Sequence, residues 1–311
     1  PSTDHLSIEN IEIFRKNNYW NYLKILNPVG QLKETDTLLE AKLHFNEMKE
    51  NDVIKKDNDD HYYVYQIKLK GHSQTGFLSL ANIDDFTNEK IKAHEKIYEN
   101  RMRERAEQML NIKTQIGPIY VIYQENKNIS NLLNSIVNKK PDYDFESFDQ
   151  SIHKLWCISN KEFILELSSF FSNQIDNFYI ADGHHRMGAM KLISELKYNK
   201  NINQDNFMIA AFSSNEAKIF DYNRVVRDLN GLSEEKFLEL ISEKFIINRE
   251  DRPFKPIKNK QFGMYHENKW YSIEYKELLK NNSIIDNLDI NILNNFIFKK
   301  YLNIKDVNND E

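Results

Sequence analysis

The chain has 311 residues, 42 of them lysine or arginine and 47 aspartate or glutamate, a formal net charge of −5 and a single cysteine. One cysteine excludes an internally disulfide-bonded secreted domain and a zinc site built on several cysteines. The sequence contains no run of about 18 apolar residues, so we expect no membrane-spanning helix. The slightly negative net charge argues against a dedicated nucleic-acid binder. The first residues lack a signal-peptide pattern, so we expect a cytoplasmic protein.

Helices and strands are mixed in the first part of the chain. Apolar spacing and β-branched or aromatic runs predict, in order, helix 8–26, helix 37–48, strand 62–69, strand 77–80, helix 87–110, strand 116–123 and helix 130–137. The first two strands are expected to form a hairpin around a turn at 71–76.

A polar, acidic link at 141–150 leads into the second part. The predicted order there is strand 152–158, helix 161–172, strand 178–181, helix 187–196, strands 207–212 and 217–220, helix 232–244, strands 261–265 and 269–275, and helix 291–301, with a frayed end at 306–311. Because strands and helices do not alternate strictly, we expect an α+β fold. Two domains are expected, 1–140 and 141–311.

The strongest functional signal follows the strand at 178–181. Asp182, Gly183, His184, His185 and Arg186 come directly before a predicted helix, whose start offers unpaired N–H groups and a positive dipole end. Gly183 permits a sharp turn and a close approach to a ligand. This arrangement suits phosphate, with Arg186 as a bidentate donor, His184 and His185 as donors or proton carriers, and Asp182 holding Mg²⁺ or orienting a histidine.

The alternative interpretation of this run is structural. Asp182 would then only cap the helix, and the two histidines would lie on its surface. A cap does not explain why two histidines and an arginine follow it.

A second cluster lies within the predicted helix 87–110. His94, Glu95 and Lys96 are adjacent and share no helix face. An irregular helix start could aim Glu95 and His94 together, with Glu95 as a general base and His94 or Lys96 on a phosphate. Arg105 adds positive charge on a face that it shares with Arg101. The alternative is a solvated helix stabilised by Glu–Arg pairs.

These motifs resemble a family called domain of unknown function 1015. Its signature is similar to residues 179–186, Tyr-Ile-Ala-Asp-Gly-His-His-Arg, and its His-Glu-Lys-Thr motif to residues 94–97, with isoleucine replacing threonine. Weaker matches are Asp4, Glu104-Arg105, Gly117-Pro118-Ile119, His153 with Leu155-Trp156, and 221–226, which includes Arg224. The family's Pro-Lys-Ser-Thr motif is not found in this sequence.

The core motif also resembles a wider fold group that contains ParB, sulfiredoxin and archaeal free-serine kinases, in which this strand–loop–helix element binds nucleotide phosphates. The resemblance implies a ParB/sulfiredoxin-like mixed sheet around 150–230, with flanking helices and an N-terminal helical and hairpin lobe. It implies phosphoryl transfer from ATP or ADP, with Mg²⁺, to a small hydroxylated metabolite such as free serine. Glu95 would take the acceptor proton, and Arg105 and Arg224 would neutralise charge.

Two other functions stay open. One is a ParB-like regulatory module that binds CTP or ATP without kinase activity, and the other is a hydrolase with a metal on His184, His185 and either His94 or His153. Cys157 is expected to be a buried apolar residue rather than a nucleophile, and sulfiredoxin-type reduction is not expected because residues 182–186 contain no cysteine. The expected partners are a nucleotide and a small-molecule substrate, without nucleic acid or membrane, and a homodimer is compatible with the sequence.

Overall fold

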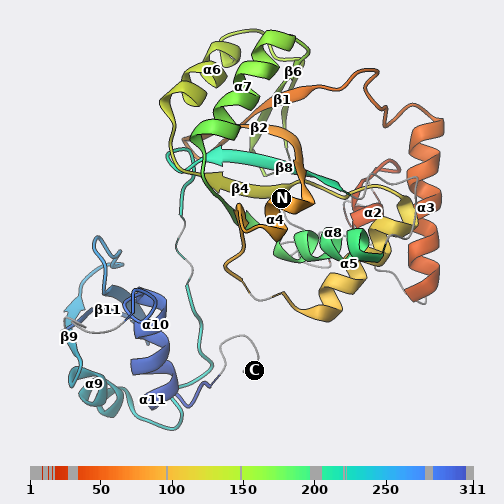
Figure 1. The fold of residues 1–311 in the computed structure, drawn as a ribbon. Coiled ribbons are helices and arrows are strands. Elements are labelled where there is room, and N and C mark those ends of the chain that lie inside the picture. Colours follow the sequence, from red (N-terminus) through yellow and green to blue (C-terminus); the bar gives the residue numbers. More distant parts are fainter. Residues whose placement is uncertain are drawn as a thin grey trace. The chain divides into compact units, whose positions relative to one another are not determined.

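A computed structural model describes residues 9, 13, 16, 18–26, 34–95, 97–147, 149–196, 205–219, 221, 223–276 and 283–305. The chain forms two compact units, Pro1–Ile219 and Phe220–Glu311, which we call unit 1 and unit 2 (Figure 1). Each unit has its own hydrophobic core. This division differs from the expected one at residue 140, because strands from both sides of that position pair within unit 1.

Unit 1 is built on one eight-stranded mixed sheet in the order β3-β7-β4-β8-β2-β1-β6-β5. The strands are β1 (Tyr62–Leu69), β2 (His72–Asn82), β3 (Ile91–Lys92), β4 (Ile119–Tyr123), β5 (Tyr143–Glu146), β6 (Ile152–Ile158), β7 (Phe178–Asp182) and β8 (Asn206–Ser213). The helices are α2 (Leu23–Leu26), α3 (Glu34–Glu50), α4 (Ile83–Thr87), α5 (Glu99–Ile112), α6 (Lys127–Val137), α7 (Lys161–Gln174) and α8 (His184–Leu196). The predicted α+β class, with a mixed sheet and flanking helices, is confirmed.

The hairpin of β1 and β2 turns earlier than expected. Lys70 and Gly71 have φ angles of +48° and +78°, which is the backbone of a two-residue hairpin turn whose twist matches that of the strands. Strand β2 therefore starts at His72, inside the stretch where the sequence predicted a turn at 71–76. On its other edge β1 pairs with β6, and both of these strands have the predicted bounds.

The predicted helix at 87–110 is wrong in its first half. The chain instead forms the end of α4, the short strand β3 and a loop, and α5 begins only at Glu99. The reason is tertiary, because Ile91 is buried and pairs in parallel with Phe178 at the sheet edge. His94 and Glu95 therefore lie in a loop and not on a helix face.

Other differences are local. The expected polar link at 141–150 contains the edge strand β5, whose four residues are all exposed. The predicted strand at 217–220 is absent from its described part, since residues 217–219 form neither helix nor strand. Part of the predicted helix at 8–26 lies outside the described residues. Of the described ones, residues 9, 13 and 16 are helical, and 18–26 contains only the short α2.

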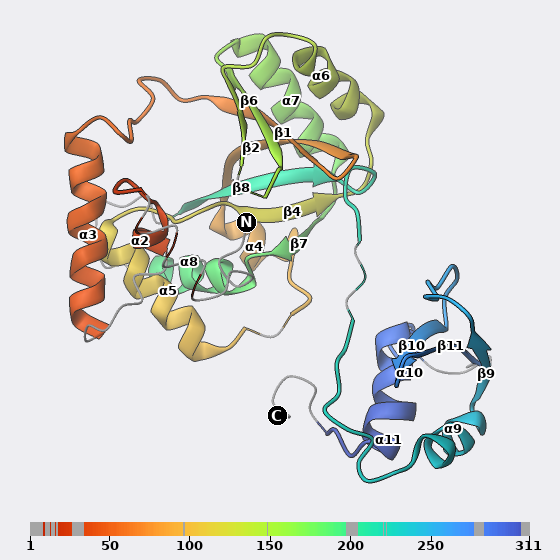
Figure 2. The ribbon, with the colours of Figure 1, turned by 180° about the vertical axis from the view of Figure 1, so that it is seen from behind.

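The helices of unit 1 gather at two places along the sheet. Helices α6 and α7 lie beside β1 and β2, whereas α8 packs against β4 and α5 packs against α8 (Figures 1 and 2). The core between them is continuous and includes Val64 and Trp156 from one end and Ile180 and Met187 from the other. This core fixes the end of β7 and the start of α8.

Unit 2 is smaller and has a three-stranded antiparallel sheet in the order β10-β11-β9. Its elements are α9 (Glu234–Ser242), β9 (Phe245–Glu250), β10 (Gln261–His266), β11 (Lys269–Tyr275), α10 (Asp289–Leu293), the π-helical turn η2 (Asn294–Phe298) and α11 (Lys299–Tyr301). The hairpin at 261–275 is confirmed, whereas β9 was not predicted. Across the described parts of both units, no helix is long and apolar enough to cross a membrane.

Candidate functional site

The Asp-Gly-His-His-Arg run forms the junction between β7 and α8. Strand β7 ends at Asp182, and Gly183 has a φ of +97°, a conformation that side chains disfavour. The Gly183 carbonyl accepts the first helical hydrogen bond, from the Met187 amide at 2.8 Å. Helix α8 therefore begins at His184, three residues before the predicted start, and both histidines lie in its first turn.

His184 is the buried centre of the junction. Its side chain is 2% exposed, and its Nδ1 lies 3.1 Å from the Oε2 of Glu95, whose side chain is 56% exposed. The His94 ring meets the His184 ring edge-on at 4.6 Å. Burial, and next the neighbouring His94, lower the pKa of His184 below its ordinary value of 6.5. At neutral pH His184 is therefore uncharged, and its Nδ1 lies against the Glu95 carboxylate.

The second ring nitrogen of His184, Nε2, lies in the interior of the protein. His184 Nε2 is hidden from solvent and has no hydrogen-bond partner within the described part of the chain. An unpaired acceptor lone pair is easier to bury than an unpaired N–H, which agrees with a proton on Nδ1. His184 thus acts as a rigid, uncharged support for a carboxylate that reaches the surface.

His185 ties the start of α5 to the same junction. The Tyr98 backbone amide lies 3.3 Å from His185 Nε2 as its donor, and the two rings stack at 5.9 Å with an angle of 11°. Tyr98 is the N-cap of α5 and makes no capping hydrogen bond with its side chain. The N-termini of α5 and α8 therefore adjoin, and each contributes a positive dipole end.

Arg186 is bound within the protein. Its Nη1 donates to the Pro118 carbonyl and its Nη2 to Asp182 Oδ2, each at 2.5 Å. A Cβ at Gly117 or Gly183 would lie 3.1 Å from the guanidinium, so both glycines leave room for it. Arg186 and Asp182 therefore brace the turn against the start of β4. The sequence had predicted phosphate and Mg²⁺ as their partners.

The remaining predicted residues are distributed as follows. Arg105 points toward α2, where its Nη1 donates to the Leu26 carbonyl at 3.3 Å. The same Nη1 donates within α5 to Gln108 Oε1 at 3.1 Å. Lys96 lies outside the described residues. Arg224 belongs to unit 2, so its place beside the junction stays a prediction.

His153 does not join the other histidines. It lies on β6, five strands away from β7 in the sheet, which is about 24 Å at the usual strand spacing. The predicted alternative of a metal on His153 together with His184 is therefore wrong. Nor do the described residues contain any group of three or more His, Cys, Asp or Glu side chains that could hold a metal ion.

Sequence reasoning missed the hydrogen-bonded chain around His153. The Tyr65 hydroxyl donates to His153 Nδ1 at 2.7 Å, Nε2 donates to Ser151 Oγ at 2.7 Å, and Ser151 donates to Asp149 Oδ1 at 2.5 Å. Phe145 stacks on the His153 ring at 5.1 Å. The polar residues Asp149, Ser151 and His153 at every second position, in the turn before β6 and at its start, are the signal that could have shown it.

Comparison with known proteins identifies one family. A family model described as "Protein of unknown function (DUF1015)" matches residues 1–291. No curated protein and no solved structure matches the chain significantly. The match extends over the junction and over most of both units, and the chain therefore belongs to the DUF1015 family.

Proposed function

We propose that this protein is a nucleotide-dependent phosphotransferase that acts on a small hydroxylated metabolite, such as free serine. The observation that carries the proposal is the pairing of Glu95 with His184 beside the first turn of α8. A half-exposed carboxylate held by a buried, uncharged histidine has a fixed position and stays open to a ligand on its other oxygen.

The phosphates would bind at the adjoining helix starts. The first turn of α8 has backbone N–H groups without helical acceptors, and the start of α5 lies beside it through the contact of Tyr98 with His185. The Arg186 guanidinium adds a positive charge, and its bonds to Pro118 and Asp182 fix its position at this turn. These bonds use two of the five N–H donors of the guanidinium, so the others can donate to phosphate. Gly183 lets the backbone approach the ligand closely.

Glu95 would then act as the general base. Its Oε2 is held by His184, and Oε1 accepts the proton of the acceptor hydroxyl. The deprotonating oxygen attacks the terminal phosphorus of the nucleotide, a new P–O bond forms, and the bond to the bridging oxygen breaks. ATP thereby leaves as ADP, or ADP as AMP, and the proton stays on Glu95 until it is released to solvent.

The donor set fits a magnesium ion that arrives with the nucleotide. Magnesium in such sites is held by one or two carboxylates together with phosphate oxygens and water. Asp182 is exposed, and with one oxygen committed to Arg186 its other oxygen can serve as such a ligand. When bound, the ion neutralises phosphate charge. The fold assignment to the ParB/sulfiredoxin group belongs to the same proposal and is supported by the junction of strand, glycine turn and histidine-bearing helix.

The test is a direct search for product. The purified full chain is incubated with ATP or ADP, Mg²⁺ and a panel of hydroxyl amino acids and small polyols, and phosphorylated products are detected by mass spectrometry. We expect a monophosphate of one acceptor class. Absence of product across the whole panel would overturn the proposal, and nucleotide binding without product would favour the regulatory module instead.

A matched pair of variants assigns the base. Glu95→Gln keeps the shape of the side chain but cannot take a proton, and we expect the turnover rate to fall by about 100-fold or more. Glu166→Gln removes an exposed carboxylate from α7, outside the junction, and should leave the rate unchanged. Equal rates for both variants would exclude Glu95 as the base.

A further inference from the structure

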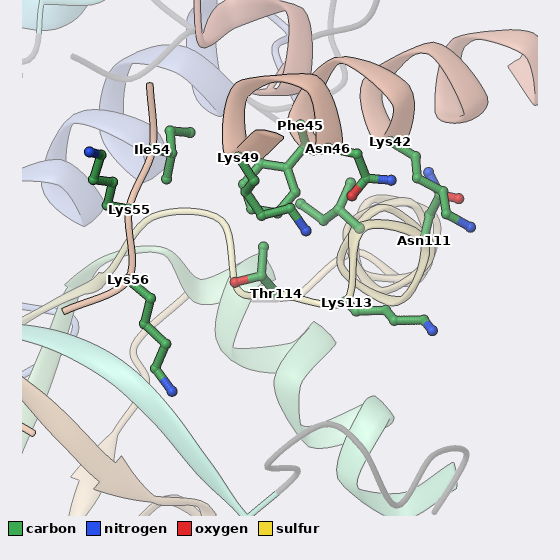
Figure 3. Close-up of a pocket in the computed structure, with 11 residues that line it drawn as sticks. Lys42, Phe45, Asn46, Lys49, Ile54, Lys55, Lys56, Asn111, Lys113 and Thr114 are labelled. Atoms are coloured by element: carbon green, nitrogen blue, oxygen red, sulfur yellow. The ribbon is translucent and has the colours of Figure 1, made fainter. Parts of the chain in front are cut away.

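A cavity of about 580 Å³ lies at the opposite end of α5 from the histidine junction. It is formed by α3, the segment 54–56 and the end of α5 with the residues that follow (Figure 3). Helix α5 has 14 residues, so its two ends are about 20 Å apart. The cavity is therefore separate from the proposed phosphotransfer site.

The lining of this cavity is strongly basic. It includes five lysines and no acidic residue, in a chain whose net charge is −5. The lysines are Lys42, Lys49, Lys55, Lys56 and Lys113. Lys55 pairs with Asp52 at 3.5 Å, whereas the other four have no ion-pair partner among the residues that the structure describes.

Helix ends reduce this charge without cancelling it. The cavity adjoins the C-terminal ends of α3 and α5, where backbone carbonyls contribute about half a negative charge each. Together with Asp52 these ends offset about two of the five positive charges. About three positive charges remain, more than is needed to compensate the helix dipoles.

The remaining lining groups restrict the kind of ligand. Phe45 and Ile54 provide apolar surface, and Asn46 and Thr114 provide hydrogen-bonding groups. Figure 3 shows the Lys49 amine above Thr114, between α3 and the end of α5, while Lys55 points away from the other lining residues. The volume is that of a site for a small molecule, and a concave site suits such a ligand better than an extended polyanion.

We propose that this cavity binds a small phosphorylated metabolite that carries two or more negative charges, with its less polar part against Phe45. Phosphate oxygens would be bound by Lys42, Lys49 and Lys113, whose flexible side chains can close on an anion from both helices. Lys49 already lies over the Phe45 ring, with its amine 4.8 Å from the ring centre, so a cation and an aromatic face are adjacent.

The probe is inorganic tripolyphosphate, and its binding to the full chain is measured by calorimetry. We expect saturable binding that weakens with salt, and hydrogen-exchange protection of residues 45–56 and 111–114. The triple variant Lys42→Gln, Lys49→Gln, Lys113→Gln should bind about tenfold more weakly or worse. The corresponding triple Lys→Arg variant keeps the charges and should bind as the wild type does.

Three surface lysines elsewhere in unit 1 provide the charge control. Lys68→Gln, Lys139→Gln and Lys161→Gln together remove the same charge from exposed positions outside the cavity lining, and binding should be unchanged. Unfolding midpoints of all variants show that the fold is retained. The proposal is overturned if tripolyphosphate does not bind, if the cavity variant binds as wild type, or if protection falls only at the start of α8. Tighter binding of a single-stranded oligonucleotide or of phosphatidylserine vesicles, lost in the cavity variant, would also overturn it.

Discussion

Arg186 shows how much the role of a residue depends on partners that are distant in sequence. An arginine after two histidines at a helix start is typical of a phosphate ligand, and the sequence predicted that role. Its guanidinium also donates to the Pro118 carbonyl and the Asp182 carboxylate. Pro118 is 68 residues away, so no local pattern could reveal this contact. The sequence therefore predicted a strand–turn–helix junction at these residues but not the internal bonds of Arg186.

Gly183 gives a direct test of this brace. Gly183→Ala places a Cβ in a backbone conformation that alanine disfavours and 3.1 Å from the Arg186 Nε. We expect the free energy of unfolding of unit 1 to fall by about 2 kcal/mol or more. Urea unfolding followed by circular dichroism measures this change.

The matched control is Gly71→Ala in the hairpin turn. Gly71 also has a positive φ, +78°, but an added Cβ would meet no atom within 4 Å. Its cost is therefore backbone strain alone, and the difference between the two variants measures the contact with Arg186. If Gly71→Ala is as destabilising as Gly183→Ala, the space around the guanidinium does not constrain residue 183.

The titration of His184 should make the free energy of unfolding depend on pH. Its pKa is lowered in the folded state, mainly by burial and next by His94, against contributions from Glu95 and Asp182 that raise it. Below about pH 6.5 the unfolded chain binds a proton at this site that the folded protein does not. Stability is therefore fully present above that pH and is lost as the pH falls from there through the folded-state pKa.

Replacing the imidazole isolates this contribution. His184→Asn keeps a donor for Glu95 but does not titrate, so the loss of stability between about pH 7 and pH 5 should be smaller than in the wild type. His153, whose pKa is also lowered by burial, contributes to the same loss in both proteins. Identical pH profiles of the unfolding midpoint for wild type and variant would contradict this account of His184.

At the scale of elements, the sequence predicted best those strands whose own residues decide their structure. Strands β1 and β6 are rich in aromatic and β-branched residues and have the predicted bounds. Strand β5 was missed because all four of its residues are exposed at the sheet edge, so it lacks an apolar pattern.

The loop between β3 and α5 shows why the candidate site could not be derived in full. Its charged residues have high helix propensity, and the sequence placed them on one long helix. The pairing of Ile91 with Phe178 and the stacking of Tyr98 on His185 are long-range contacts that override this propensity. These contacts bring Glu95 to His184. The sequence suggested only that an irregular helix start could aim Glu95 and His94 together.

At the scale of the whole molecule, the two units have separate cores. The histidine junction and the basic cavity both belong to unit 1, whereas Arg224 belongs to unit 2. The described residues from 214 to 233 form neither helix nor strand, and Ile219 and Val225 are 97% and 96% exposed. Exposed segments of this kind are where proteases cut folded proteins first.

We therefore expect limited trypsin digestion to cut first after Lys218, Arg224 or Arg227 and to leave two stable fragments. Each fragment keeps its own hydrophobic core, so each should unfold cooperatively when heated, as followed by calorimetry on the separated fragments. Early cuts within α5 or α8, or a fragment that aggregates or digests completely, would contradict independent folding. A unit 1 fragment that ends at Lys218 also tests Arg224, because it retains Glu95 and His184 but lacks that arginine. A lower turnover than the full chain, reproduced by Arg224→Gln but not by Arg227→Gln, would assign Arg224 to the site, whereas equal turnover would remove it.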